Sequence, residues 1–192
     1  MDDDLRPDYR GETRWSRRGF LNSAALASLV LTLPRGAMAA IQRLKKPVQI
    51  GVIADLHHDV MHDGADRLGA FLKRMSEVQP DAILQLGDFA YPSPENRGII
   101  RQFNDAHSRP LHVIGNHDLD MGLTTAQCVE EFRMPGRYYA QHIEGLQLLV
   151  LDGNDRESPS YKGGYPSYVG AEQVTWLKAQ LATLEGPIIV AC

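Results

Sequence analysis

The stretch LHVIGNHD at residues 111–118 constrains the fold most, because a short apolar run passes directly into small and polar residues. The run LHVI predicts a buried strand, and we expect Gly115 to let the chain turn sharply where that strand ends. Asn116, His117 and Asp118 would then project together from the carboxyl end of the strand, where open α/β sheets bind ligands. The stretch therefore predicts a functional site on an α/β fold.

Two earlier stretches repeat this arrangement of an apolar run followed by polar residues. Residues 48–57, VQIGVIADLH, are apolar until they reach Asp55 and His57. Residues 81–88, DAILQLGD, end in the same manner at Asp88. Carboxylate, imidazole and amide groups are ligands for divalent metals. Three predicted strand ends thus supply ligands, and we interpret them as one metal site.

The motifs D-x-H at residues 55–57, G-D at residues 87–88 and G-N-H-D at residues 115–118 follow one another in a familiar order. With them the chain resembles the calcineurin-like metallophosphoesterases over residues 47–192. The resemblance implies an α/β fold, namely a four-layer α/β/β/α sandwich of two mixed sheets with the metals at the strand ends. It also implies a metal-dependent enzyme that hydrolyses phosphate mono- or diesters.

The resemblance further implies a centre of two divalent ions, which could be Mn, Fe or Zn. Asp55 and His57 would bind the first ion, and Asp88 would bridge the two. Asn116 would bind the second ion through its amide oxygen. Ions ~3.5–4 Å apart would lower the pKa of a shared water, so that a metal-bound hydroxide attacks the phosphate ester.

Two residues of the G-N-H-D motif are expected to be catalytic and not metal ligands. By the resemblance, His117 faces the scissile phosphate, where it gives a proton to the leaving oxygen or stabilises its charge. Asp118 is expected to hold the His117 ring in the right tautomer and orientation, as carboxylates commonly do for histidines.

Residues 87–91, GDFAY, also fit G-D-x-x-Y, a pattern of the purple acid phosphatases whose tyrosine binds ferric iron. That pattern accompanies D-x-G, whereas this chain carries D-x-H. We therefore take His57 as the ligand, and Tyr91 as a packing residue or as a hydroxyl behind the ligands. This choice predicts a colourless protein.

The family pattern continues past the segment that residues 187–192 resemble, with a histidine and a later G-H-x-H motif that supply further metal ligands. The sequence stops at Cys192, before these motifs, so the C-terminal part of the pattern is missing. Two interpretations stay open. The chain is a fragment of an active phosphoesterase, or it is a catalytically incomplete remnant that binds a metal or another ligand.

The amino-terminal residues resemble a twin-arginine signal peptide, with SRRGFL at residues 16–21 and A-M-A at residues 37–39. We expect residues 1–39 to be removed and residues 40–192 to form the metallophosphoesterase domain. The apolar stretch at residues 22–33 is shorter than the ~20 residues that span a bilayer. We therefore expect no stable membrane span, export by the twin-arginine translocation machinery, and a periplasmic or secreted location.

Composition limits the partners that the domain could bind. The 192 residues are 43% hydrophobic and 23% charged, with a formal net charge of −4, which suits a domain with a core. A mildly acidic chain without clusters of Lys and Arg argues against long nucleic acid, because basic residues supply most of that affinity. The expected partner is a small phosphate-ester substrate, whose identity and mono- or diester class the sequence leaves open.

Apolar spacing and turn residues predict the remaining elements. We expect helices at 64–78, 95–107, 124–132 and 173–184, a hairpin at 137–151 that turns at Glu144 and Gly145, a long loop at 152–170, and a strand at 188–191. The loop contains Asn154, Tyr161, Tyr165 and Tyr168. These residues either pack within the loop or form a wall that recognises the organic part of a substrate, and His112 is expected to be structural.

Overall fold

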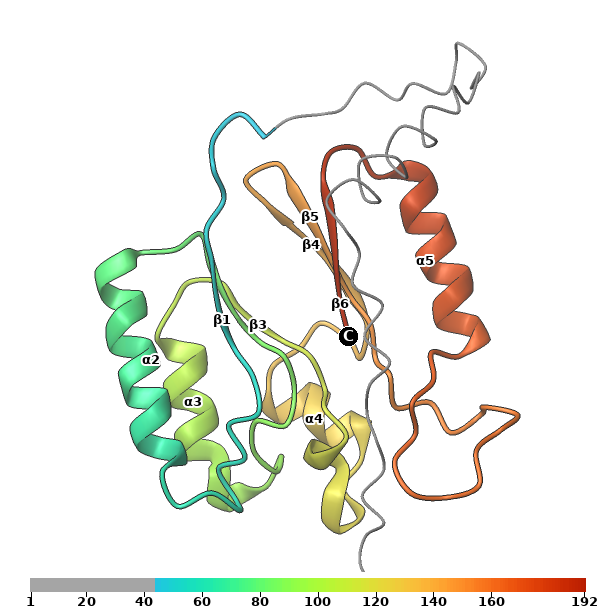
Figure 1. The fold of residues 1–192 in the computed structure, drawn as a ribbon, viewed down its shortest axis with the longest axis horizontal. Coiled ribbons are helices and arrows are strands. Elements are labelled where there is room, and N and C mark those ends of the chain that lie inside the picture. Colours follow the sequence, from blue (N-terminus) through green and yellow to red (C-terminus); the bar gives the residue numbers. More distant parts are fainter. Residues whose placement is uncertain (1–43) are drawn as a thin grey trace, which may run out of the picture. The chain divides into compact units, whose positions relative to one another are not determined.

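The computed structural model describes residues 44–192 of the chain. The first half of this range forms a three-stranded parallel sheet with its connecting helices (Figure 1). The predicted signal peptide at residues 1–39 lies outside the described residues. The sheet pairs strands β1 (Ile50–Ile53), β2 (Ala82–Gln85) and β3 (Pro110–His112) in that order. Because all three strands run the same way, their carboxyl ends meet at one edge of the sheet.

Helices connect these parallel strands, as parallel pairing requires. Helix α2 (Gly64–Val78) follows β1, and helix α3 (Arg97–Asp105) follows β2 after a short 3-10 turn, η1 (Pro94–Asn96). The bounds of α2 are those that the sequence predicted, and Gln79 ends it in the left-handed conformation, with a φ of 51°. The 3-10 turn occupies the start of the predicted second helix, because Pro94 provides a helical φ without an N–H.

The second sheet is mixed and pairs strands β4 (Tyr139–Ile143), β5 (Leu146–Val150) and β6 (Ile188–Ala191). Strand β4 runs antiparallel to β5, and β6 runs parallel to it. The predicted hairpin turn is confirmed: Glu144 and Gly145 have φ values of 51° and 95°, as a two-residue turn between twisted strands requires. Helix α5 (Ala171–Thr183) lies between β5 and β6 in the chain and beside this sheet in Figure 1.

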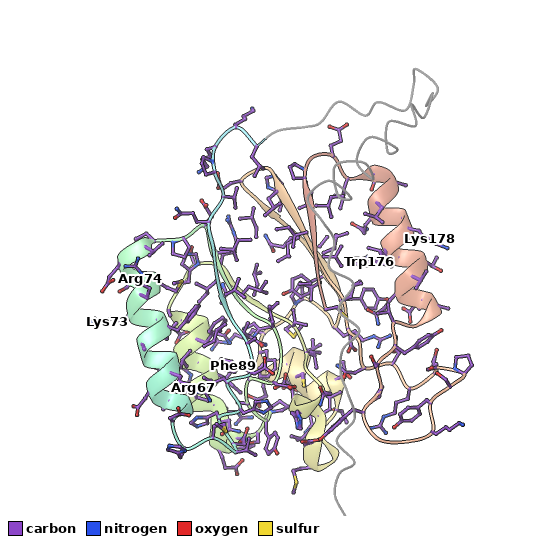
Figure 2. The ribbon with its side chains drawn as sticks, viewed as in Figure 1. Arg67, Lys73, Arg74, Phe89, Trp176 and Lys178 are labelled. Carbon is purple, nitrogen blue, oxygen red and sulfur yellow. The ribbon has the colours of Figure 1, made fainter. Side chains whose placement is uncertain are left out.

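One apolar core joins the two sheets and the helices between them. Ile83, Leu84, Leu148 and Val150 belong to it, and all are less than 5% exposed. Three further members are the phenylalanines Phe89, Phe103 and Phe132, the first of which Figure 2 shows inside the fold. By contrast, Lys73 and Arg74 project from the outer side of α2 (Figure 2).

The core also encloses a polar network centred on His112, which is structural as expected. Its Nδ1 accepts from Gln85 Nε2 at 3.1 Å, and its Nε2 donates to Asn104 Oδ1 at 2.7 Å. The ring stacks on Phe132 with centroids 5.2 Å apart. Burial lowers the pKa of His112 to about 3, so the ring is neutral near pH 7.

Two expectations about the sheets need correction. We expected two mixed sheets, but within residues 44–192 the first sheet is wholly parallel, because a helix returns the chain to the same edge after each strand. The strand predicted over residues 111–114 pairs only as Pro110–His112. Val113 still donates its N–H to Gln85 O at 3.0 Å, and Ile114 is buried beyond the ladder. The fold is therefore α/β with two small sheets.

A short helix and a long loop complete the described chain. Helix α4 (Thr125–Glu131) begins with a capping box between Thr124 and Gln127, as the threonines at its start predicted. Residues 152–170 form the expected loop, in which Asn154 and Tyr168 make one isolated bridge. No helix within residues 44–192 is long and apolar enough to cross a membrane.

Candidate metal centre

The ends of β1 and β2 bring together Asp55, His57 and Asp88. One ligand atom of each lies within 4.8 Å of the others. His57 Nε2 is 3.8 Å from Asp55 Oδ1 and 3.6 Å from Asp88 Oδ2. These separations are too long for hydrogen bonds and only slightly longer than the ~3–3.5 Å between neighbouring ligands of one ion. Two carboxylates and an imidazole at this spacing fit a divalent ion.

The backbone at all three of these residues is left-handed, which is uncommon for residues other than glycine. Asp55, His57 and Asp88 have φ values of 53°, 48° and 53°. Such conformations cost of order 1 kcal/mol each and persist only where the surrounding structure holds them. The three strained residues are also the three candidate ligands. The strained backbone therefore orients these side chains toward one another.

Backbone hydrogen bonds between the two loops hold these conformations. Asp55 N–H donates to Gly87 O at 3.2 Å, and His57 N–H donates to Asp88 O at 2.8 Å. On the other side, the guanidinium of Arg67 in α2 donates to the carbonyls of Asp55 and Leu56. Sequence reasoning missed this role for Arg67, because nothing in its position on the helix distinguishes it from a solvated arginine.

The glycines before Asp88 and Asn116 allow the two loops to touch. A Cβ on Gly87 would lie 2.7 Å from the Cα of Gly115, and a Cβ on Gly115 would collide with the Asp88 side chain. Gly87 also has a φ of 95°. Gly115 does not have a positive φ, so the structure does not use the conformational freedom of a glycine at this position. Gly115 is needed for close approach.

Asp118 is buried, with 1% exposure, and joins the two loops through its carboxylate. Its Oδ1 accepts the N–H groups of Phe89 at 2.8 Å and Ala90 at 3.2 Å. Its Oδ2 accepts those of Gly115 at 2.9 Å and Asp88 at 3.1 Å. Burial raises the pKa of Asp118 to about 7, although the N–H donors favour the ionised form. The residue therefore holds the loops of the G-D and G-N-H-D motifs in register.

The His117 ring contacts other partners than the one expected. Its Nδ1 lies 2.8 Å from Asp120 Oδ2 and 3.2 Å from the hydroxyl of Tyr165. Asp118, which we expected to orient the ring, makes backbone contacts instead, because its side chain turns into the core. The hydrogen bond to Asp120 raises the pKa of His117, while burial lowers it. The ring centroids of His117 and His57 are 5.0 Å apart.

Asn116, the fourth predicted ligand, lies near two of the other three. It lines a cavity of about 260 Å³ together with Asp55 and Asp88. Asn154, from the loop at residues 152–170, lines the same cavity and fixes its own amide by donating to Ile114 O at 3.0 Å. Three of the four predicted ligands thus line one cavity, and His57 lies next to two of them, Asp55 and Asp88.

Tyr91 lies in the wall of a smaller pocket that it shares with His57, Asp88 and His117. Its backbone N–H donates to Asp59 Oδ2 at 2.6 Å. Burial raises the pKa of the Tyr91 phenol, and the nearby carboxylates of Asp120 and Asp59 raise it further. The phenol therefore stays protonated in the absence of a metal.

Sequence reasoning also missed Asp59 and Asp120 as residues that support the site, and it named Tyr165 as a possible substrate contact without its contact to His117. Asp120 follows the G-N-H-D motif by two positions, and that proximity is the one signal that could have drawn attention to it. Tyr165 is 48 residues from His117, and only the folded loop shows that they touch.

Fold and site together define a class: an α/β protein with candidate metal ligands at the carboxyl ends of a parallel sheet. The chain belongs to the calcineurin-like phosphoesterase family, whose model matches residues 48–189. Members of this family are generally metal-dependent hydrolases, and they typically bind two metals.

Solved structures are similar to this chain at low sequence identity. The protein TT1561 of Thermus thermophilus is 17% identical over 75% of this chain and 67% of that protein, with a TM-score of 0.51. A dimetal phosphatase from Danio rerio is 16% identical over 75% of this chain and 68% of that protein, with a TM-score of 0.49. The likeness to the Thermus protein supports the fold alone. A search of curated proteins gave no significant match.

Proposed function

We propose that this protein is a metal-dependent hydrolase of phosphate mono- or diesters with a dinuclear centre. The observation that carries the proposal is the convergence of Asp55, His57 and Asp88 within 4.8 Å in a member of a phosphoesterase family. Asp88 and Asn116, which line one cavity, would hold the second ion. Two bound ions would supply a water of lowered pKa and a clamp on the ester oxygens.

His117 is the proposed proton donor to the leaving oxygen. The carboxylate of Asp120 lies against Nδ1 of the ring at 2.8 Å, which fixes the ring orientation and leaves Nε2 as the atom that can give up a proton. The raised pKa of His117 favours the protonated ring that this step needs. The role proposed for Asp118 is structural, since its carboxylate fixes the loop that carries His117.

A second candidate function is metal binding without hydrolysis. The observation that favours it is the size of the ligand group: among residues 44–192, the group of His, Asp, Glu and Cys side chains spaced for a metal contains three residues. Three ligands suffice for one ion, whereas the proposed mechanism uses two. The number of ions bound by the protein therefore distinguishes the two functions.

The test uses the full chain loaded with Mn, Fe(II) or Zn. We expect hydrolysis of p-nitrophenyl phosphate or of bis(p-nitrophenyl) phosphate, its loss on chelation, and its loss in Asp88→Asn. Asp105→Asn is the matched control, because Asp105 is the last residue of α3 and its exposed carboxylate pairs with Arg133, not with a residue of the site. Binding of a single ion without turnover of either ester would support the second candidate and reject the first.

The proposed ligand set also predicts a colourless protein. With His57 and not Tyr91 on the first ion, no phenolate binds iron and no strong visible band arises. The absorption spectrum of the iron-loaded protein tests this. A visible band that disappears in Tyr91→Phe would show that the phenol is a ligand and that the first site is assigned wrongly.

The export route and the complete architecture also belong to the proposal. We propose that residues 1–39 direct the folded protein through the twin-arginine machinery to the periplasm or the exterior, supported by the SRRGFL sequence. Replacing Arg17 and Arg18 by lysine should retain the protein in the cytoplasm, which cell fractionation would show. The four-layer sandwich is supported by α2 and α3 beside the first sheet and α5 beside the second (Figure 1).

A further inference from the structure

A second cavity adjoins the one that Asp55, Asp88 and Asn116 line. It has a volume of about 320 Å³ and is lined by residues that include Asp120, Met121, Arg156 and Tyr165. Asn116, Asn154 and Pro166 line both cavities, so the two spaces adjoin along a shared wall. We call this second cavity the loop groove, because the loop at residues 152–170 forms one side of it.

The opposite side of the loop groove is the 3-10 segment η2 (His117–Gly122), which carries the proposed proton donor. The segment is kinked at Asp120 and Met121, and Met121 has a φ of 59°. The 3-10 turn that leads into the kink puts the Asp120 carboxylate against the His117 ring three residues earlier. Met121, at the kink, is 86% exposed. The loop groove thus lies on the Nδ1 side of the His117 ring, where Asp120 and Tyr165 contact it.

Buried contacts fix the loop side of the groove. Asp155 accepts from Arg137 and Gln173, and also from the N–H of Gly170 at 2.7 Å. Asp155 lies near the start of the loop and Gly170 at its end, so one carboxylate ties both ends together. Arg156 follows this anchored residue directly and lines the groove. Its backbone position is therefore set by the fold.

The charges around the two cavities are unequal. Among the described residues that line them, Arg156 is the only cation, while Asp55, Asp88 and Asp120 are acidic. The first two are candidate metal ligands, and the Asp120 carboxylate accepts hydrogen bonds from the His117 ring and from the Tyr165 hydroxyl, the latter at 3.0 Å. No carboxylate within residues 44–192 forms a salt bridge with Arg156, although Arg137 close by forms two.

We propose that the loop groove binds the alcohol portion of the substrate, and that this portion carries a second anionic group that Arg156 recognises. The inference rests on the proposed function, in which the phosphate of the ester lies at the candidate metal ligands. The loop groove adjoins their cavity along Asn116, Asn154 and Pro166, so the alcohol portion of the ester can extend into the groove. The exposed faces of Met121 and Tyr165 provide an apolar rim for its carbon skeleton. The substrate class is a phosphate ester of a carboxylated or phosphorylated alcohol.

The kinetic test compares 4-carboxyphenyl phosphate with phenyl phosphate on the metal-loaded full chain. Intrinsic reactivity cancels, because each ester is compared between variants. In Arg156→Gln, we expect the preference in kcat/KM for the carboxylated ester to fall roughly fivefold, through KM, as for a partly solvated ion pair. Arg156→Lys should keep part of the preference. Lys162→Gln, which removes another exposed cation of the same loop, should keep all of it.

A binding test separates this inference from the proposed function, since it needs no turnover. Titration of the full chain with 4-hydroxybenzoate, phenol and 4-hydroxyphenylphosphonate, an analogue of a phosphate group that the hydrolase cannot cleave, should show by NMR or calorimetry that the two anions bind more tightly than phenol and lose this advantage in Arg156→Gln. The stronger of the two identifies the anion as carboxylate or phosphate. Anion binding that depends on Arg156, without turnover of any ester, would support the assignment of the loop groove and reject the proposed hydrolase activity. Equal binding of anions and phenol, or an unchanged preference in Arg156→Gln, would overturn the inference.

Discussion

Replacing Asp118 by asparagine is the sharpest test of how the site is held together. The substitution keeps the shape of the side chain but changes one carboxylate oxygen into an NH₂ group, which cannot accept a hydrogen bond. The native oxygens each accept two backbone N–H groups, from Phe89 and Ala90 on one and from Gly115 and Asp88 on the other. Asparagine can serve only one of these pairs.

The cost follows from the pair that loses its acceptor. An unsatisfied buried N–H costs about 1–3 kcal/mol, and the N–H groups of Asp88 and Gly115 are partly buried. Two such groups therefore lower the free energy of unfolding by roughly 2–4 kcal/mol. Because the same contacts fix the loop of Asp88, we also expect divalent ions to bind roughly tenfold more weakly.

Urea unfolding of the metal-free protein at pH 6 measures the first effect, because below the Asp118 pKa of about 7 the native side chain and the asparagine are both mostly neutral. Metal titration at pH 8 measures the second. For an m value of about 2 kcal/mol/M, the midpoint should fall by roughly 1–2 M. Asp105→Asn is the control, because its exposed ion pair with Arg133 at 3.3 Å contributes at most ~1 kcal/mol. If the urea midpoint of Asp118→Asn falls no further than that of Asp105→Asn, the role assigned to the Asp118 carboxylate is refuted.

Three further predictions concern groups that support the site or the core. Asp120→Asn should lower kcat about tenfold for an alkyl phosphate and less for p-nitrophenyl phosphate, whose leaving group needs no proton; equal losses would contradict a role in proton donation. His112 has a folded pKa of about 3, below its ordinary 6.5, so its contribution to stability is complete above pH 6.5 and falls as the pH drops, by roughly 2 kcal/mol between pH 6.5 and 5; the urea midpoint of the protein should therefore fall toward that of His112→Gln, which has no ring to titrate, and a constant gap between the two would contradict this. Arg137→Met leaves Asp155 without its cation and should lower the unfolding free energy by about 3–5 kcal/mol, part of which Asp155→Asn in the same chain restores; no recovery would show that the ion pair is not the cause.

The candidate ligands were accessible to sequence reasoning because each follows an apolar run. Asp55, Asp88 and Asn116 stand at the ends of predicted strands, and parallel strands bring such ends to one edge. The helix at Gly64–Val78 and the hairpin turn at Glu144 were equally local, since a few neighbouring residues fix the periodicity or the φ values that each needs.

The partners of His117 were not accessible in this way. Asp118 is adjacent to it in the sequence, yet the 3-10 turn that begins at His117 puts residue i+3, Asp120, on the same face as the ring, while the Asp118 carboxylate faces inward. Tyr165 reaches the same ring from a loop that Asp155 anchors. Such contacts depend on how two distant segments pack, which no local pattern encodes.

The sequence by itself determined the elements, their order and the residue types at the strand ends, because hydrophobic periodicity and turn chemistry act over a few residues. The tertiary structure alone decided which carboxylate orients His117, why Gly115 must lack a side chain, and where Arg156 lies. These depend on distances between segments far apart in the chain, and the packed core fixes those distances.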